Sequence, residues 1–403
     1  MFKGILQHRR DRALILPVIG AQLIIGTSLF LMPLLIETLK VDVGLSGRTA
    51  GLLLSLELGA SALTTLWLSA RGHYHSPRRW AIAGGIVAVA STALTLISPA
   101  LPMLLATRLL AGIGAGVVGA EATSVLGRGI DRERLIAIVT ISSITNAAVW
   151  LAVLPWLIDR FGYRAPYACL LLIFMCGTCL LLRLPSPSRR LSARRQLSGS
   201  RLAAPALLAV AAVFLTQLGQ GAFWSLQETY GTNAGFSSHA IGVILSVATL
   251  LLLLGAVGAA WASDRFGRST TLLTLLALNA LSIVLVSTVA IHWIYLAANA
   301  VQSITNLSSV IYQLAVAASL DRLGRAVAMA AALVTLGNGI GPGVATNISA
   351  AFGAPSVGIF VFALNAVALG LYWAVMLRRV EEPQVAVRGD AAAGIGRPRR
   401  DIN

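Results

Sequence analysis

The sequence predicts an all-α integral membrane protein with twelve transmembrane helices in two parallel six-helix repeats. Three observations support this prediction. Of the 403 residues, 57% are apolar and only 11% are charged, whereas an ordinary soluble domain has about 25% charged residues. The chain contains twelve apolar runs that approach or exceed the roughly 20 residues needed to cross a bilayer. Its second half also repeats motifs of its first half at a constant spacing.

The expected spans follow the apolar runs, with short loops between them. In chain order they are residues 13–36, 47–69, 80–98, 101–125, 134–158, 165–184, 205–229, 240–262, 269–290, 292–319, 325–350 and 355–377. Twelve helices of about 22 residues would use most of the chain, which leaves room for two tails and short connections.

The remaining segments divide the chain into two bundles. Residues 1–12 are expected to form a cytoplasmic tail, and residues 13–184 the first six-helix bundle. Residues 185–204 are rich in Ser, Pro and Arg, as in a flexible cytoplasmic linker. The second bundle is expected at 205–380, and the polar residues 381–403 are predicted to be a disordered cytoplasmic tail.

The net charge of +16 comes from Lys and Arg residues whose positions along the chain indicate the membrane topology. With the N-terminus inside, 26 of the 31 Lys and Arg residues fall in the tails and the even-numbered loops. This positive-inside pattern places both termini in the cytoplasm. Only two of the 31 cations are Lys, which together with the abundant Ala and Gly favours a GC-rich bacterial genome. We therefore expect the protein in a bacterial inner (plasma) membrane. No basic face with interleaved aromatic residues is present, which argues against nucleic-acid binding.

An internal repeat relates the two halves at an offset of 191 residues. The matching segments are 35–38 with 226–229, 44–55 with 235–246, and Phe161-Gly162 with Phe352-Gly353. Because each half holds six spans, both halves start on the same side of the membrane. They are therefore parallel repeats related by an axis along the membrane normal, an arrangement known among transporters.

The loop after the eighth expected span carries a recognisable motif. Its residues are Asp264, Arg265, Phe266, Gly267 and Arg268. They resemble the Gly-x-x-x-Asp-Arg-x-Gly-Arg cytoplasmic gate motif of the major facilitator superfamily, with Ala260 at the leading glycine position. The resemblance covers residues from about 13 to 380. It implies twelve helices and alternating access, with the motif holding the halves together when the cytoplasmic side is closed.

The corresponding loop of the first half departs from the family pattern. His73 or Tyr74 stands at the Asp position, and the basic end survives as Arg78 and Arg79. The acidic partner of this gate motif is therefore missing from the first half. His73 and His75 could make the loop sensitive to pH, or they could be solvated histidines without a role.

Two charged residues are predicted to lie deep within the first bundle. Arg108, Gly112 and Gly114 resemble a second family motif, Arg-x-x-x-Gly-x-Gly, whose Arg faces the central cavity in proton-coupled members. Glu57 lies at a similar depth on the second span, which neighbours the fourth in this fold. We therefore expect a Glu57–Arg108 pair that is broken or proton-modulated during transport. The alternatives are a static ion pair, and snorkelling of Arg108 to the outer interface.

Two further acids lie at the ends of spans. Glu228 lies at the outer end of the seventh expected span, where it is a candidate for proton coupling. Its repeat partner is Glu37 at the outer end of the first, so both could instead be structural residues at helix ends. Glu121, near the inner end of the fourth span, is expected to pair with loop arginines.

Polar stripes mark three spans that line the central cavity in the family. The candidate substrate-cavity residues are Gln22, Gly26, Phe30, Gln217, Gln220, Trp224, Gln227, Asn299, Ser303, Asn306 and Gln313. A polar stripe on an apolar helix faces a water-filled cavity or another helix. Contact with substrate and hydrogen bonding between helices are both open at this point.

A glycine and proline cluster lies in the eleventh expected span. Gly337, Gly341 and Pro342 are expected to bend or loosen this helix where the halves meet. The drug-antiporter motif expected in the fifth span is absent, since Leu154-Pro155 stands where Gly-Gly would be. Cys176-x-x-Cys179, within the apolar sixth span, is interpreted as small buried hydrophobic residues rather than a redox pair.

These observations predict a secondary active transporter of a small polar or amphipathic organic solute. Proton coupling is expected because acids and an Arg lie within the spans, and a slight preference falls on efflux. No ATP-binding Gly-Lys-Ser/Thr loop is present. The expected partners are the solute, protons and the lipid bilayer, with no cofactor or metal, and the protein is expected to be a monomer. The alternatives are an uncoupled uniporter, a non-transporting receptor and a membrane-embedded enzyme.

Overall fold

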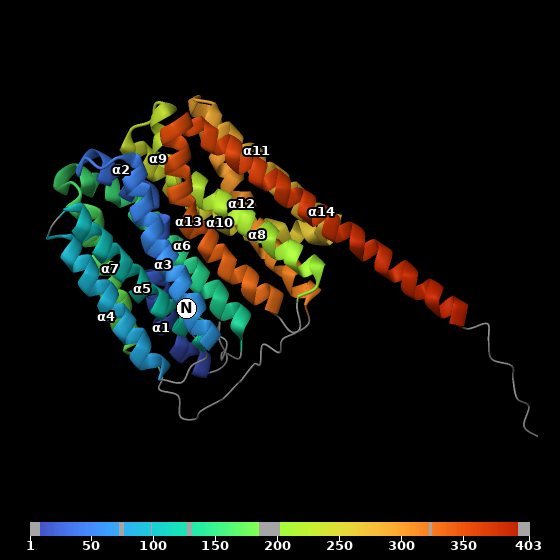
Figure 1. The fold of residues 1–403 in the computed structure, drawn as a ribbon. Coiled ribbons are helices and arrows are strands. Elements are labelled where there is room, and N and C mark those ends of the chain that lie inside the picture. The colour runs from blue at the N-terminus through green and yellow to red at the C-terminus, as the bar shows by residue number, and fades with distance from the viewer. Residues whose placement is uncertain are drawn as a thin grey trace, which may run out of the picture.

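The computed structural model describes residues 9–71, 76–97, 99–126, 131–184, 202–321 and 325–393. This part of the chain forms fourteen helices and no strands (Figure 1). The first half contains α1 (Arg9–Phe30), α2 (Met32–Val41), α3 (Gly47–Arg71), α4 (Pro77–Thr95), α5 (Leu101–Leu126), α6 (Arg132–Phe161) and α7 (Arg164–Leu181). The second half contains α8 (Ala204–Ser225), α9 (Gln227–Asn233), α10 (Ser238–Phe266), α11 (Arg268–Thr288), α12 (His292–Leu320), α13 (Arg325–Phe352) and α14 (Ala354–Ala393).

The fourteen helices correspond to the twelve expected spans, because the first and seventh spans are each broken in two. The breaks fall at Leu31 and at Leu226. At the first break, Pro33 has no N–H group to donate to the carbonyl of Leu29, which interrupts the helical hydrogen-bond series. Eleven of the described helices are long and apolar enough to cross a membrane. The expected third span, which is α4, is not among these eleven.

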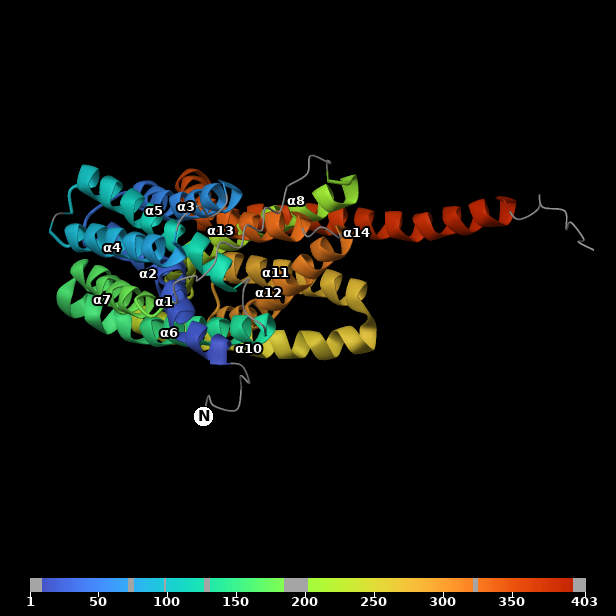
Figure 2. The ribbon, with the colours of Figure 1, turned by 90° about the horizontal axis from the view of Figure 1, so that it is seen from below.

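The helices pack as two bundles that meet along two helix pairs. In the first bundle α5 packs against α3 and α4, while α7 packs against α1 and α4. In the second, α8 packs against α13 and α14, while α12 packs against α10 and α11. The bundles meet where α3 packs against α13 and α6 against α10 (Figure 2). The predicted arrangement of two six-span repeats is confirmed.

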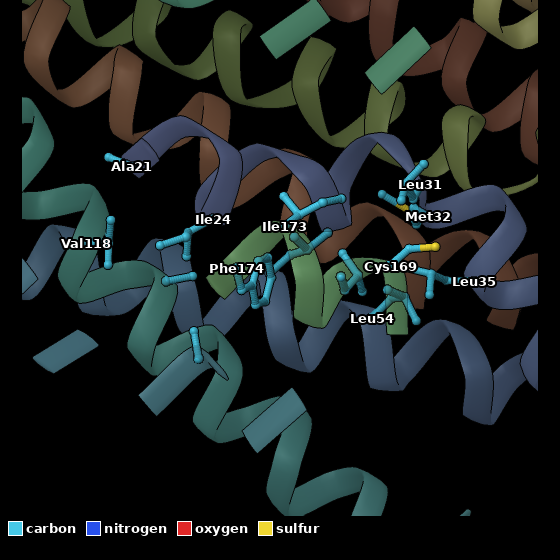
Figure 3. Packing of buried hydrophobic residues seen from close by; sticks show 14 of the residues in the cluster. Ala21, Ile24, Leu31, Met32, Leu35, Leu54, Val118, Cys169, Ile173 and Phe174 are labelled. Carbon is cyan, nitrogen blue, oxygen red and sulfur yellow. The ribbon is translucent and has the colours of Figure 1, made fainter. Parts of the chain in front are cut away.

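Small and aliphatic side chains fill the interior of the first bundle (Figure 3). Ile24 of α1 and Val118 of α5 belong to the same buried cluster as Phe174 of α7. Cys169 also lies in this cluster. The expectation of burial is wrong for Cys176 and Cys179, which are exposed on α7 because they face away from the bundle.

The ends of the bundles differ in part from the expected boundaries. α14 continues as one helix to Ala393, so residues 381–393 are helical where the sequence predicts disorder. Residues 1–8, 185–201 and 394–403, which hold most of the expected tails and linker, lie outside the described residues. His73 and Tyr74 of the degenerate gate motif lie outside them as well.

Candidate functional site

The expected ion pair between Glu57 and Arg108 is present within the first bundle. Arg108 Nη1 of α5 lies 3.2 Å from Glu57 Oε2 of α3, and the side chains are 1% and 5% exposed. Ser28 of α1 donates a hydrogen bond of 2.7 Å to the other oxygen of Glu57. Arg108 therefore points into the bundle and pairs with an acid, and does not extend to the outer interface.

Arg108 has further partners on two other helices. Its Nη2 atom donates to Thr95 Oγ1 of α4 at 2.7 Å, with Thr92 Oγ1 at 3.4 Å. Its guanidinium lies over the ring of Tyr167 of α7, 5.0 Å from the ring centre. Within the described residues, Arg108 Nε and the Tyr167 hydroxyl have no hydrogen-bond partner. The charge of Arg108 is thus held by a carboxylate, two hydroxyl groups and an aromatic face.

The glycines that follow Arg108 explain how α3 and α5 come close enough for this pair to form. A Cβ atom at Gly112 would overlap the carbonyl oxygen of Glu57. One turn further along, a Cβ atom at Gly116 would lie 2.5 Å from the carbonyl oxygen of Ser61. The two backbones are therefore in contact, and only glycine fits at these positions.

Most of the predicted cavity residues of the second bundle form hydrogen bonds to side chains of neighbouring helices. Four contacts join α8 or α9 to α12 or α13, and all except the one between Asn338 and Gln217 are fully buried. They are Gln227 to Asn299 at 2.8 Å, Gln302 to Gln220 at 2.9 Å, Asn338 to Gln217 at 2.9 Å, and Thr216 to Gln313 at 2.9 Å. Hydrogen bonding between helices, one of the two roles left open by the sequence, is thus the role seen here for five of the candidates.

The other candidates fall into two groups by exposure. Gly26 and Ser303 are buried, whereas Gln22, Phe30, Trp224 and Asn306 are partly exposed. The partly exposed group comes from α1, α8 and α12, helices of both bundles. Asn338 was missed by the sequence analysis, although it stands directly beside Gly337 in the glycine cluster.

Trp224 links the two bundles by hydrogen bonds to the backbone. Its Nε1 atom donates to the carbonyl oxygens of Leu29 at 3.1 Å and Phe30 at 3.2 Å. The carbonyl of Leu29 is the group that Pro33 leaves without a helical donor. The break between α1 and α2 therefore creates the acceptor that Trp224 uses.

The glycine cluster of α13 serves close packing against both bundles. A Cβ atom at Gly337 or Gly341 would collide with the backbone of α8, and one at Gly339 would lie 3.0 Å from the backbone nitrogen of Gly59 in α3. The backbone nitrogen of Gly343 donates to Ser55 Oγ of α3 at 2.7 Å. α13 continues unbroken through Pro342.

A further contact between the bundles joins α6 to α10. His239 Nε2 lies 3.0 Å from Asp159 Oδ2, and the His239 ring lies 4.3 Å from that of Trp156. These residues, like Ser55 and Trp224, lie in the half of each helix that is predicted to face outward. The described contacts therefore close the predicted outer end of the junction between the bundles.

The cytoplasmic gate motif lies where α10 ends and α11 begins. Asp264 and Arg265 belong to the last turn of α10, and Gly267 separates the two helices with φ +79°. This conformation favours glycine, which explains its place in the motif. Arg268 starts α11, and Arg78 and Arg79 lie in the first turn of α4. Their gating role stays a prediction.

Among the described residues, no group of three or more His, Cys, Asp or Glu side chains could hold a metal ion. The described helices form two six-span bundles with a buried ion pair inside the first, which is the arrangement of a multi-pass membrane protein of the solute-transporter class.

Comparison with known proteins gives the family. The family model of the Major Facilitator Superfamily matches residues 18–212 and again residues 209–400, one match for each half. The chain therefore belongs to the major facilitator superfamily, whose members transport solutes across membranes. No curated protein sequence matches it.

A solved structure supports the same fold. The structure is similar to a crystal structure of a variant of the nucleoside transporter NupG, with a TM-score of 0.69 and 12% sequence identity. The alignment covers 91% of this chain and 99% of that one. Membership of this family indicates a transporter rather than an enzyme.

Proposed function

We propose that this protein is a proton-coupled secondary active transporter of small polar or amphipathic organic solutes that works by alternating access. The buried Glu57–Arg108 pair is the observation that carries the proposal. A charged side chain within a span costs about 2.5–3.5 kcal/mol on insertion scales, so such residues are retained for function. A carboxyl group inside a bundle can also take up a proton when its cationic partner moves away.

The surroundings of the pair support a proton cycle at Glu57. When Glu57 is ionised, it neutralises Arg108 at 3.2 Å. When Glu57 is protonated, Arg108 keeps Thr95 at 2.7 Å and the face of Tyr167 as partners, so its charge stays solvated. Ser28, which donates to Glu57, comes from α1 and so links the carboxyl group to a helix that contacts the second bundle. Glu228 is the other acid proposed to bind a proton.

The partly exposed candidates support the proposed solute class. Gln22 and Asn306 offer amides, while Phe30 and Trp224 offer aromatic surface, which suits a small polar or amphipathic molecule. The similar structure is that of a nucleoside transporter, and nucleosides belong to this chemical class. We propose export as the direction to test first, in a bacterial inner membrane, by a monomer whose two termini are cytoplasmic.

Proton movement in proteoliposomes tests the proposal. Purified protein is screened against a panel of small solutes that includes nucleosides, with an internal pH dye and labelled solute as readouts. Glu57→Gln is compared with Glu121→Gln, the same chemical change in a buried acid outside the pair. We expect a solute-evoked pH change that Glu57→Gln abolishes and Glu121→Gln retains.

Two results would change the interpretation. Solute flux that only equilibrates, with no pH change, would make the protein an uncoupled facilitator and the ion pair a static structural element. The fully buried and satisfied carboxylate of Glu57 is the observation that favours this second candidate. A pH change that survives in Glu57→Gln would place the proton on another group.

A further inference from the structure

The repeat brings two equivalent acids together at the predicted outer end of the molecule. Glu37 of α2 and Glu228 of α9 are related by the offset of 191 residues. Glu37 pairs with Lys40 at 2.7 Å, and both side chains are about one third exposed. The position in the second half that corresponds to Lys40 is Gly231. The second copy of the ion pair has therefore kept its acid and lacks its cation.

Packing explains why no cation stands at Gly231. A Cβ atom there would lie 2.6 Å from Ile241 Cγ1 of α10 and 3.0 Å from the Tyr295 hydroxyl of α12. Both distances are shorter than an ordinary van der Waals contact. The close approach of α9 to these helices excludes a lysine side chain, so Glu228 is not neutralised in the way that Glu37 is.

Glu228 is buried and incompletely partnered. It lies beyond Ser225, where the apolar span of α8 ends, and only 3% of the residue is exposed. Its Oε2 atom has no hydrogen-bond partner within the described residues. Burial raises the pKa of Glu228 to about 7; a hydrogen bond from Ser238 opposes the shift, Glu37 adds to it and Lys40 opposes it.

The place of Glu228 links its charge to the contact between the bundles. α9 and α2 lie at the same end of the molecule (Figure 1), and α2 packs against both α9 and α8. The titratable side chains that face Glu228 are Glu37 and Lys40 of α2 and Tyr295 of α12. If the bundles separate at this end, α2 moves away from α9 and the carboxyl group of Glu228 becomes exposed to water.

We propose that Glu228 is a second proton-binding site, separate from Glu57, and that its bound proton stabilises the closed outer junction. The inference rests on the alternating-access part of the proposed function and not on coupling at Glu57. The closed state holds the proton up to about pH 7, whereas a hydrated carboxyl group releases it near its ordinary pKa of 4.5. Between these two values, rising pH therefore favours opening of the outer end.

Distance measurement between spin labels tests this proposal without any substrate. The labels are placed at Ile97 and Trp293, exposed residues at the predicted outer ends of the two bundles, in a background with the three cysteines replaced by alanine. One proton with pKa values of about 7 and 4.5 predicts that the ratio of closed to open molecules falls up to about 70-fold from pH 5 to pH 8. Glu228→Gln, which stays neutral, is expected to remove this dependence.

Three variants make the outcomes distinct. Lys40→Gln removes the cation that lowers the pKa of Glu228. The pH above which the ratio of closed to open molecules stops falling should therefore increase. His239→Gln removes the other titratable contact of the junction, and Glu57→Gln removes the proposed coupling carboxyl group. A pH dependence that persists in Glu228→Gln and disappears in either of the last two variants overturns the proposal, as does a ratio that is independent of pH. Loss in Glu57→Gln would at the same time favour the proposed proton coupling.

Discussion

Gly112 is the residue at which a single methyl group should separate the two helices that hold the ion pair. In Gly112→Ala the new Cβ atom would overlap the carbonyl oxygen of Glu57 and lie 2.9 Å from its carbonyl carbon and 3.0 Å from Ala60 Cβ. Non-bonded carbon atoms prefer about 3.5–4.0 Å, so α3 and α5 must move apart by roughly 1 Å.

The expected energy follows from two opposing effects. Overpacking in a close-packed interior costs typically about 1–3 kcal/mol, and replacing Gly by Ala inside a helix returns up to about 1 kcal/mol. A net loss of about 1–2 kcal/mol is therefore expected. The weakening of the ion pair should be larger than this loss of stability. The separation of 3.2 Å between Arg108 and Glu57 already exceeds the roughly 2.7–2.9 Å of a strong charged hydrogen bond, so any further separation weakens the pair.

Two assays on the same purified protein check this prediction. Thermal unfolding in detergent reports the loss of stability, and solute-evoked proton movement in proteoliposomes reports the loss of coupling. Gly370→Ala is the matched control, because Gly370 is an exposed helical glycine whose Cβ atom would meet nothing within 4 Å. If Gly112→Ala melts at the wild-type temperature and moves protons as the wild type does, the close approach of α3 and α5 does not maintain the pair.

Three further outcomes are expected. Trp224→Phe removes the donor to the carbonyls of Leu29 and Phe30, and the loss of about 1 kcal/mol should raise the open fraction of the outer junction about fivefold in distance measurements. Gln302→Leu leaves the Gln220 amide unpaired and should cost about 1–3 kcal/mol, whereas the double change of Gln220 and Gln302 to Leu should restore much of the melting temperature. Because the pKa of Glu228 rises from 4.5 to about 7 on burial, folding stability should fall from pH 4.5 to 7. Glu228→Gln should not show this loss of stability, which is worth up to about 3 kcal/mol at pH 8. Equal dependence of the melting temperature on pH in the wild type and in Glu228→Gln would contradict this prediction.

The features that could be predicted from the sequence are those that the bilayer requires. A span needs a long apolar run, and a buried charge needs a partner, so the number of spans and the pairing of Glu57 with Arg108 could both be expected. The motif glycines added the reason for the pairing, since a glycine one turn after Arg108 indicates a close approach between two helices. These signals are local in the sequence, or they depend on the depth of a residue in the membrane, which can be estimated by counting residues along a helix.

Partners that come from distant helices could not be predicted in the same way. Thr95 and Tyr167 surround Arg108, but a lone Thr or Tyr in an apolar helix has many ordinary roles. The polar stripe of α12 was visible, yet a stripe does not tell whether its amides face water or another stripe, and Asn299 faces Gln227. The break at Leu226 was also hidden, because no proline marks it as Pro33 marks the break after α1.

The two halves share one fold, but equivalent positions carry side chains of different chemistry. This difference indicates that the two bundles have different roles in transport. At the offset of 191 residues, Arg108 corresponds to Asn299. In the first bundle this position holds a buried ion pair, and in the second it holds an amide pair with Gln227. An ion pair changes its interactions when a proton binds, whereas an amide pair does not titrate in the physiological range and can exchange its hydrogen bonds for those of a polar solute. If the proposed function is right, substitutions at Arg108 should alter proton dependence, and substitutions at Asn299 should alter solute selectivity.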